Sequence, residues 1–207
     1  MPAARRRVTA ATVALIAAIA GGGAATGCSA PQRTLPAGSI ELPVDPVRQS
    51  DAHDCGAATL DALAAYHGAR LDDESRRQLA ECAAGSEGLT GADLRSALEP
   101  AGLDVFLFRG TPDHAPTGLW RALEGGLPPV VAISSAPGRN HFVLLVGYDP
   151  RSGDVAVLDP AQGRLVIPAD RFLDCWRGAE RFTLLAVPSR PSFAPSFAPS
   201  YPTEDQP

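Results

Sequence analysis

The chain has 207 residues, of which 45% are hydrophobic and 20% charged, a composition typical of one globular domain with extensions and not of a disordered or fibrous chain. Its formal net charge is −5, and it becomes more acidic if the three arginines at 5–7 are removed, so we expect no nucleic-acid partner. The sequence contains no Cys-x-x-Cys and no His-x-x-x-His pair, so we expect no metal site and no cofactor.

Residues 1–28 have the pattern of a lipoprotein export signal. The arginines precede an apolar run at 8–20, which is shorter than the roughly 20 residues that span a bilayer. The segment ends in Ala-Thr-Gly-Cys, which resembles the lipobox, whose cysteine is lipidated and becomes the mature N-terminus. We expect Cys28 to anchor the protein in the cell envelope, on the extracytoplasmic side of a bacterial membrane. A plain secretory signal is the alternative.

The rest of the chain divides into a tether, a domain and a tail. Residues 29–45 indicate an extended tether, because 29–47 contain four prolines, and 39–44 could add an edge strand. The domain is expected at 46–188. Residues 189–207 repeat the motif PSFA and are proline-rich, so we expect a disordered tail.

Within the domain, helical patterns come before strand patterns. Apolar residues at helical spacing, with Gly or Pro at the ends, predict three helices, at 56–67, 72–84 and 91–101. Short runs rich in Val, Leu and Phe and bounded by Gly, Pro or Asp predict strands at 103–108, 129–134, 141–148, 155–158, 164–167 and 182–187. This order predicts an α+β fold with N-terminal helices followed by an antiparallel sheet.

Cys55 stands at the start of the first predicted helix. There the unpaired backbone N–H groups and the positive end of the helix dipole favour an anion, which lowers a cysteine pKa and makes the thiolate a better nucleophile. The alternative is a small buried side chain, because free cysteine is among the most buried residue types. A nucleophilic Cys55 also needs a base.

His141 is the candidate base, and it has a carboxylate partner in Asp159. The strong turn signal at 149–154 predicts that strands 141–148 and 155–158 pair as an antiparallel hairpin. The start of the first strand and the end of the second then meet, which brings His141 close to Asp159. Asp149, the rival carboxylate, belongs to the turn at the far end. The other histidines, at 53, 67 and 114, have no such partner.

Several motifs together resemble the C39 peptidases, papain-like cysteine peptidases best known as leader-cleaving domains of bacteriocin exporters. They are Gln49, Asp54-Cys55-Gly56, Tyr66-His67-Gly68, Asn140-His141-Phe142 and Leu158-Asp159-Pro160. The resemblance covers most of 46–163 and implies a papain-like fold that cleaves a peptide or protein substrate. It further implies that Cys55 attacks, His141 transfers protons, Asp159 orients His141, and Gln49 with the Cys55 N–H holds the oxyanion.

Three other functions remain open on the sequence. They are a non-catalytic C39-like binding module, a cell-wall amidase or acyltransferase with the same Cys-His pair, and a lipoprotein with a structural role. Relatives fused to exporters cut after Gly-Gly, and the sequence leaves open whether this chain does so. It also leaves open whether Cys82 and Cys175 form a disulfide or remain two separate thiols.

Overall fold

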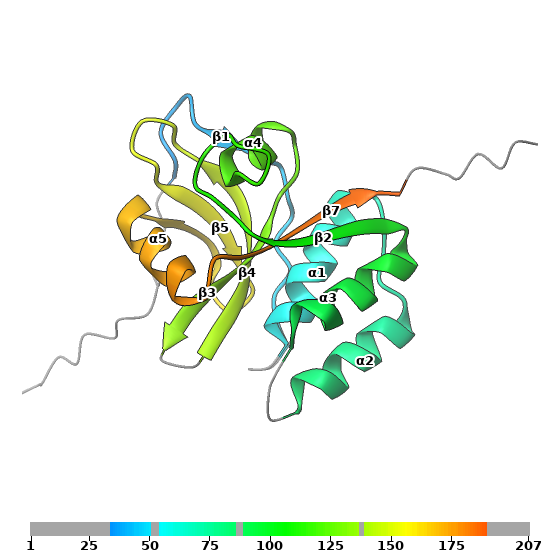
Figure 1. The fold of residues 1–207 in the computed structure, drawn as a ribbon. Helices are drawn as coiled ribbons and strands as arrows, with labels where there is room; N and C mark the ends of the chain where they lie inside the picture. Colours follow the sequence, from blue (N-terminus) through cyan, green and yellow to red (C-terminus); the bar gives the residue numbers. More distant parts are fainter. Residues whose placement is uncertain (1–33, 51–53, 86–88, 137–138, 190–207) are drawn as a thin grey trace, which may run out of the picture.

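The computed structural model describes residues 34–50, 54–85, 89–136 and 139–189 (Figure 1). The expected signal segment, Cys28 and the C-terminal tail lie outside the described residues. The helices are α1 (Cys55–Tyr66), α2 (Asp73–Ala83), α3 (Gly91–Leu98), η1 (Glu99–Ala101), α4 (Leu119–Glu124) and α5 (Ala169–Gly178). The strands are β1 (Ile40–Glu41), β2 (Leu103–Arg109), β3 (Val130–Ala136), β4 (Arg139–Tyr148), β5 (Val155–Asp159), β6 (Gly163–Ile167) and β7 (Phe182–Pro188). None of the described helices has the length and apolar character needed to cross a membrane.

The expected α+β fold is confirmed, because the three predicted helices come first and the sheet follows. Helix α2 begins after Asp72, whose side chain accepts a hydrogen bond from the Ser75 N–H. Helix α3 begins with a capping box between Thr90 and Asp93. It continues into η1, which ends at Gly102 with a φ of 79° that suits a glycine.

The sheet joins strands that are distant in the sequence. Its order is β2-β7-β3-β4-β5-β6, and β1 pairs with β4. The expected hairpin is present as the antiparallel pair of β4 and β5, with Leu144 opposite Leu158. Strand β4 begins at Arg139, so His141 lies inside a strand and not directly after a loop as expected. The cause is a longer β3–β4 ladder, in which Ile133 pairs with His141 and the strands continue past a bulge.

Each face of the sheet has its own apolar core. Helices α1, α2 and α3 pack together on one face, where Leu60, Leu79 and Leu94 meet Phe142 and Leu144. Helices α4 and α5 cover the other face, where Leu119, Phe172 and Trp176 pack against β3, β4, β5 and β6. Figure 1 shows the three N-terminal helices together on one side, with β2 and β7 crossing from them to the rest of the sheet.

Of the two open possibilities for Cys82 and Cys175, the structure does not contain the disulfide between them. Cys82 lies on α2 as an exposed free thiol. Cys175 lies on α5 and packs into the core on the opposite face of the sheet. The sheet therefore separates the two residues, a fact that helix prediction alone does not supply.

The described end of the tether is part of the fold. Ile40 and Glu41 pair with Tyr148 and Gly147 of β4, so the optional edge strand exists but is only two residues long. The Glu41 carboxylate takes a two-point ion pair from Arg164 of β6, at 2.6 and 2.8 Å. The chain that leads to Cys55 is thus fastened to the sheet before it reaches the helix.

Candidate active site

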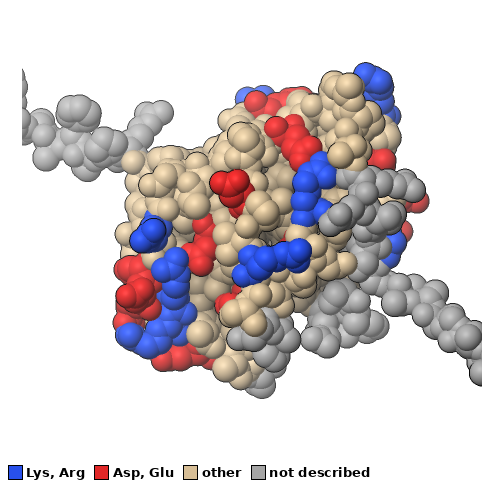
Figure 2. Space-filling view, turned by 180° about the vertical axis from the view of Figure 1, so that it is seen from behind, with Lys and Arg blue, Asp and Glu red and all other residues tan. Residues whose placement is uncertain are grey.

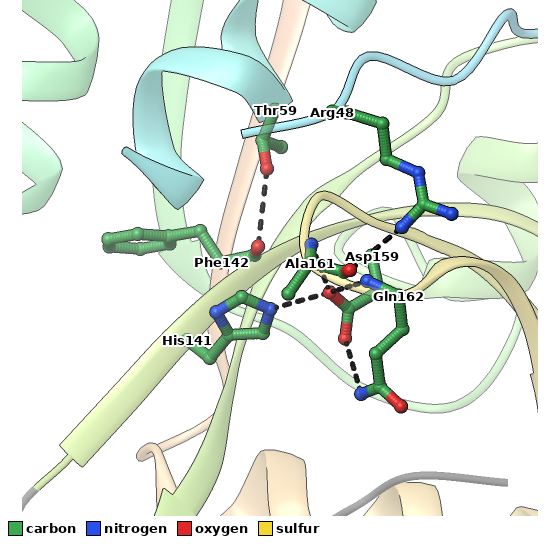
Figure 3. Close-up of polar contacts among 7 residues, drawn as sticks. All are labelled: Arg48, Thr59, His141, Phe142, Asp159, Ala161 and Gln162. Atoms are coloured by element: carbon green, nitrogen blue, oxygen red, sulfur yellow. Dashed lines mark hydrogen bonds and ion pairs between the residues drawn. The ribbon is translucent and has the colours of Figure 1, made fainter. Parts of the chain in front are cut away.

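Cys55 is the first residue of α1, and its neighbours hold it close to β4. The Asp54 carboxylate accepts hydrogen bonds from Ser50 and not from the first turn of the helix. One turn further on, the buried Thr59 hydroxyl donates to the Phe142 carbonyl at 3.2 Å (Figure 3). Glycine at position 56 lets the Leu89 side chain lie against the start of α1, since a Cβ there would come within 2.3 Å of a Leu89 methyl group.

His141 and Asp159 form a hydrogen-bonded pair on neighbouring strands. The His141 Nε2 lies 2.9 Å from the Asp159 Oδ1, and the two side chains are 19% and 3% exposed (Figure 3). The register explains the contact. Because Leu144 pairs with Leu158, Asp159 falls opposite Val143, and His141 is its diagonal neighbour on the same face.

The loop after β5 holds Asp159 in place. Its Oδ1 also accepts from the backbone N–H groups of Ala161 and Gln162, at 2.8 and 3.2 Å. Its Oδ2 accepts from the side-chain amide of Gln162 at 3.2 Å. Burial raises the pKa of Asp159, but the hydrogen bond and charge of His141 and the two backbone N–H groups outweigh it. The pKa of Asp159 is therefore below its ordinary value, and the carboxyl group is ionised at neutral pH.

The same contacts favour a charged pair of Cys55 and His141. Burial lowers the pKa of His141, but hydrogen bonds and charge from Asp159 and Cys55 raise it to about 9. Burial raises the pKa of Cys55, but the hydrogen bond from His141, the Phe142 and Gly56 backbones and the His141 charge lower it below its ordinary value. Both shifts favour a thiolate beside an imidazolium over a neutral thiol beside a neutral imidazole. The Nε2 atom of His141 is hydrogen-bonded to Asp159. The hydrogen bond between His141 and Cys55 therefore uses the other ring nitrogen, Nδ1.

Gln49 lies beside the loop that carries Asp159. Its backbone N–H donates to the Pro160 carbonyl at 3.1 Å, and its side chain is half-buried. The preceding residue, Arg48, donates from Nη1 to the Ala161 carbonyl at 2.7 Å (Figure 3). The guanidinium covers Gly163, where a Cβ would come within 3.0 Å of it. Two consecutive residues thus attach the chain before Cys55 to the loop after Asp159.

A cavity of about 580 Å³ lies on the side of β4 that faces α3, and Cys55, His141 and Asp159 are not among its lining residues. Asn140 and Phe142, on either side of His141 in the sequence, form part of its wall, as does Leu89, which contacts the α-carbon region of Gly56. The rest of the wall is mixed, with apolar residues that include Leu107 and Phe182 and polar or charged residues that include Arg109, Ser134 and Glu180.

The rejected candidates lie elsewhere. Asp149 accepts bonds from Arg151 and Ser152 and shapes the β4–β5 turn. His114 faces Glu124, at 3.1 Å, and His67 ends α1. His53 lies outside the described residues.

Sequence reasoning missed Gln162, Thr59 and Arg48. Gln162 had a usable signal, because an Asp followed by Pro-Ala-Gln-Gly is a turn in which the aspartate accepts from residues two and three positions on. The signal for Thr59 was weaker and consisted of its position one helical turn after Cys55. Arg48 had none.

Among solved structures, a double glycine motif protease from an AMS/PCAT transporter, in complex with its leader peptide, is 23% identical with a TM-score of 0.56, over 72% of this chain and 94% of that one. The peptidase domain of Streptococcus ComA, a bifunctional ABC transporter of a quorum-sensing pathway, is 20% identical with a TM-score of 0.55, over 72% and 99%. A C39-like peptidase from Bacillus anthracis is 16% identical with a TM-score of 0.57, over 72% and 97%. These likenesses establish the papain-like fold.

No curated protein matched the chain in a sequence comparison. The sequence pattern of the peptidase C39 family, in contrast, matches residues 44–187, which is more than half of the chain. That stretch contains Cys55, His141 and Asp159, the residues whose contacts are described above. The chain therefore belongs to the peptidase C39 family.

Proposed function

We propose that the protein is a cysteine peptidase that cleaves a peptide or protein substrate through Cys55, His141 and Asp159. The observation that carries the proposal is the linked set of contacts in which His141 binds Asp159 on one side and Cys55 on the other. In the reaction the Cys55 thiolate attacks the peptide carbonyl carbon. The His141 imidazolium then gives its proton to the leaving amine, and later takes one from the water that hydrolyses the acyl-enzyme.

The negative oxygen formed during attack needs hydrogen-bond donors. We assign this role to the Gln49 side-chain amide and the backbone N–H of Cys55. The Cys55 N–H belongs to the first turn of α1, where backbone donors have no partner within the helix. The attachment of the Gln49 backbone to Pro160 keeps this residue near the loop that carries Asp159. Such donors typically contribute about 10² to 10³ in rate.

The cavity lined by Asn140 and Phe142 supports a peptide substrate, because its mixed wall can accept a side chain and can also hydrogen-bond a peptide backbone. The solved relative bound to a leader peptide gives the same indication. On the face seen in Figure 2, acidic and basic side chains are interspersed, with no field of one sign that would select a charged polymer.

Selective alkylation tests the proposal before any substrate is known. At pH 6.5 iodoacetamide should modify Cys55 and spare Cys82, since desolvation and the Asp93 carboxylate raise the pKa of Cys82. Cys82→Ser is the matched control and should leave the labelling unchanged. Cys55→Ala should remove both the labelling and any cleavage of a peptide panel that includes Gly-Gly sequences. Equal labelling of the two thiols would contradict the proposal and favour a binding module.

We also propose that the protein is exported and anchored through a lipid on Cys28. The basic and apolar pattern of 1–28 supports this. The mass of the mature N-terminal peptide should therefore contain the acyl chains, and Cys28→Ser should release the protein from membranes. An unlipidated N-terminus in the membrane fraction would contradict anchoring.

A further inference from the structure

The two carboxylate oxygens of Asp159 are held by different groups (Figure 3). Oδ1 accepts from His141 and from two backbone N–H groups. Oδ2 accepts from the side-chain amide of Gln162, at 3.2 Å. No other donor to Oδ2 occurs among the described residues. A single side chain therefore determines the environment of the second oxygen.

The contact matters because a carboxylate turns easily about its last torsion, which has broad minima. Rotation would move Oδ1 away from the His141 ring. The Asp159 side chain is only 3% exposed, so water is a poor replacement for a lost donor. The Gln162 amide thus opposes rotation at the one place where the backbone of the loop does not.

The Gln162 side-chain amide also carries no charge, which suits its position beside the Asp159 carboxylate. The charged or titratable groups that act on His141 in the described structure are Asp159, from the β5 end, and Cys55, from α1. Arg48, from the segment before α1, contacts the loop at the Ala161 carbonyl and not at the carboxylate. A cation at Oδ2 would compete with the imidazolium for the charge of Asp159, whereas an amide leaves that charge to His141.

We infer that Gln162 is a positioning residue that holds Oδ2 of Asp159 and so keeps Oδ1 on the Nε2 of His141. This inference rests on the proposed peptidase function, because it assigns a role in the same site. Gln162 has no contact with the reacting sulfur, so its removal should weaken the ion pair and leave peptide binding unchanged. The expected changes are therefore in rate and pH dependence and not in KM.

Epoxysuccinate labelling of Cys55 measures the ion pair directly. Ring opening forms a carbon–sulfur bond from the thiolate, breaks a carbon–oxygen bond, and takes a proton from the imidazolium for the alkoxide. The labelling rate, followed by mass, should rise with formation of the thiolate and fall as His141 loses its proton near pH 9. The pH profile of the wild-type protein thus has an acid and a basic limb.

Gln162→Met keeps the length of the side chain and removes the donor. We expect the maximal labelling rate to fall roughly 3- to 10-fold and the basic limb to move down by about 0.5 to 1 pH unit. Gln78→Met, the same change on exposed α2, is the matched control and should reproduce the wild-type profile. In Gln162→Glu the introduced carboxylate should repel Asp159 at pH 7, and labelling relative to wild type should recover towards pH 5, where the protonated carboxyl group can donate.

Three outcomes would overturn the inference, and they are distinguishable. If Gln162→Met lowers the melting temperature but leaves both limbs in place, Gln162 supports only the fold. If Gln162→Glu shows no pH-dependent recovery, Oδ2 does not need a donor. If the wild-type profile lacks the two limbs, the proposed ion pair itself is absent, and the proposed function fails with it.

Discussion

Replacing Asp159 with asparagine removes the charge of the site while keeping its shape. The new carbonyl oxygen can take the place of Oδ1 and accept from His141 and the loop backbone. The new amide group takes the place of Oδ2, and the Gln162 amide can turn to present its oxygen. The orientation of the ring is therefore retained, and the change isolates the electrostatic part of the role of Asp159.

The size of the effect follows from the pKa of His141, which is about 9 against an ordinary 6.5. The difference corresponds to roughly 3 kcal/mol in favour of imidazolium, shared between Asp159 and Cys55. Loss of the aspartate charge should lower the pKa of His141 by about 1 to 2 pH units. Because the wild-type pKa is raised, the imidazolium persists up to about pH 9, and in Asp159→Asn it should be lost between about pH 7 and 8.

The assay is the pH profile of epoxysuccinate labelling, with peptide hydrolysis once a substrate is found. Asp159→Asn should retain measurable activity near pH 6 and lose roughly a further 10-fold relative to wild type by pH 8.5. Asp159→Ala should lose most activity at every pH, since it also removes the acceptor that orients the ring. Asp170→Asn, an exposed position on α5, is the charge control. A basic limb near pH 9 in Asp159→Asn would refute the electrostatic reasoning, and a total loss equal to that of Cys55→Ala would show that the role of the aspartate is different.

Three further substitutions test the neighbouring contacts. Gln49→Ala should lower kcat about 10²- to 10³-fold, and an unchanged kcat in peptide hydrolysis would remove Gln49 from the oxyanion site. Thr59→Val leaves the Phe142 carbonyl without its donor and should cost about 1 kcal/mol in the free energy of unfolding, measured by urea denaturation, where no change would show that the bond is dispensable. Gly56→Ala places a methyl group within 2.3 Å of Leu89 and should lower both the melting temperature and Cys55 labelling, whereas wild-type values would show that the loop at Leu89 yields without cost.

The contact between His141 and Asp159 could be anticipated from the sequence because local patterns specify it. Helical periodicity and the glycine at 68 define a helix that begins at Cys55, whatever packs against it. A turn signal between two apolar runs defines a hairpin, and a hairpin determines which strand ends meet. His141 and Asp159 are 18 residues apart, within the reach of that local argument. Helix α4 was missed because its six residues are too few for a periodic pattern.

Contacts between distant segments required the tertiary structure. Thr59 and Phe142 are 83 residues apart, and Arg48 and Ala161 are 113 apart, so no local pattern indicates that they meet. The side of the sheet on which a helix packs is likewise set by the whole apolar surface, and this is why the sequence did not show that Cys82 and Cys175 lie on opposite faces. Local sequence patterns and motifs thus indicated the candidate residues Cys55, His141 and Asp159, because they reflect local backbone geometry. Long-range packing decided which residues hold them in place.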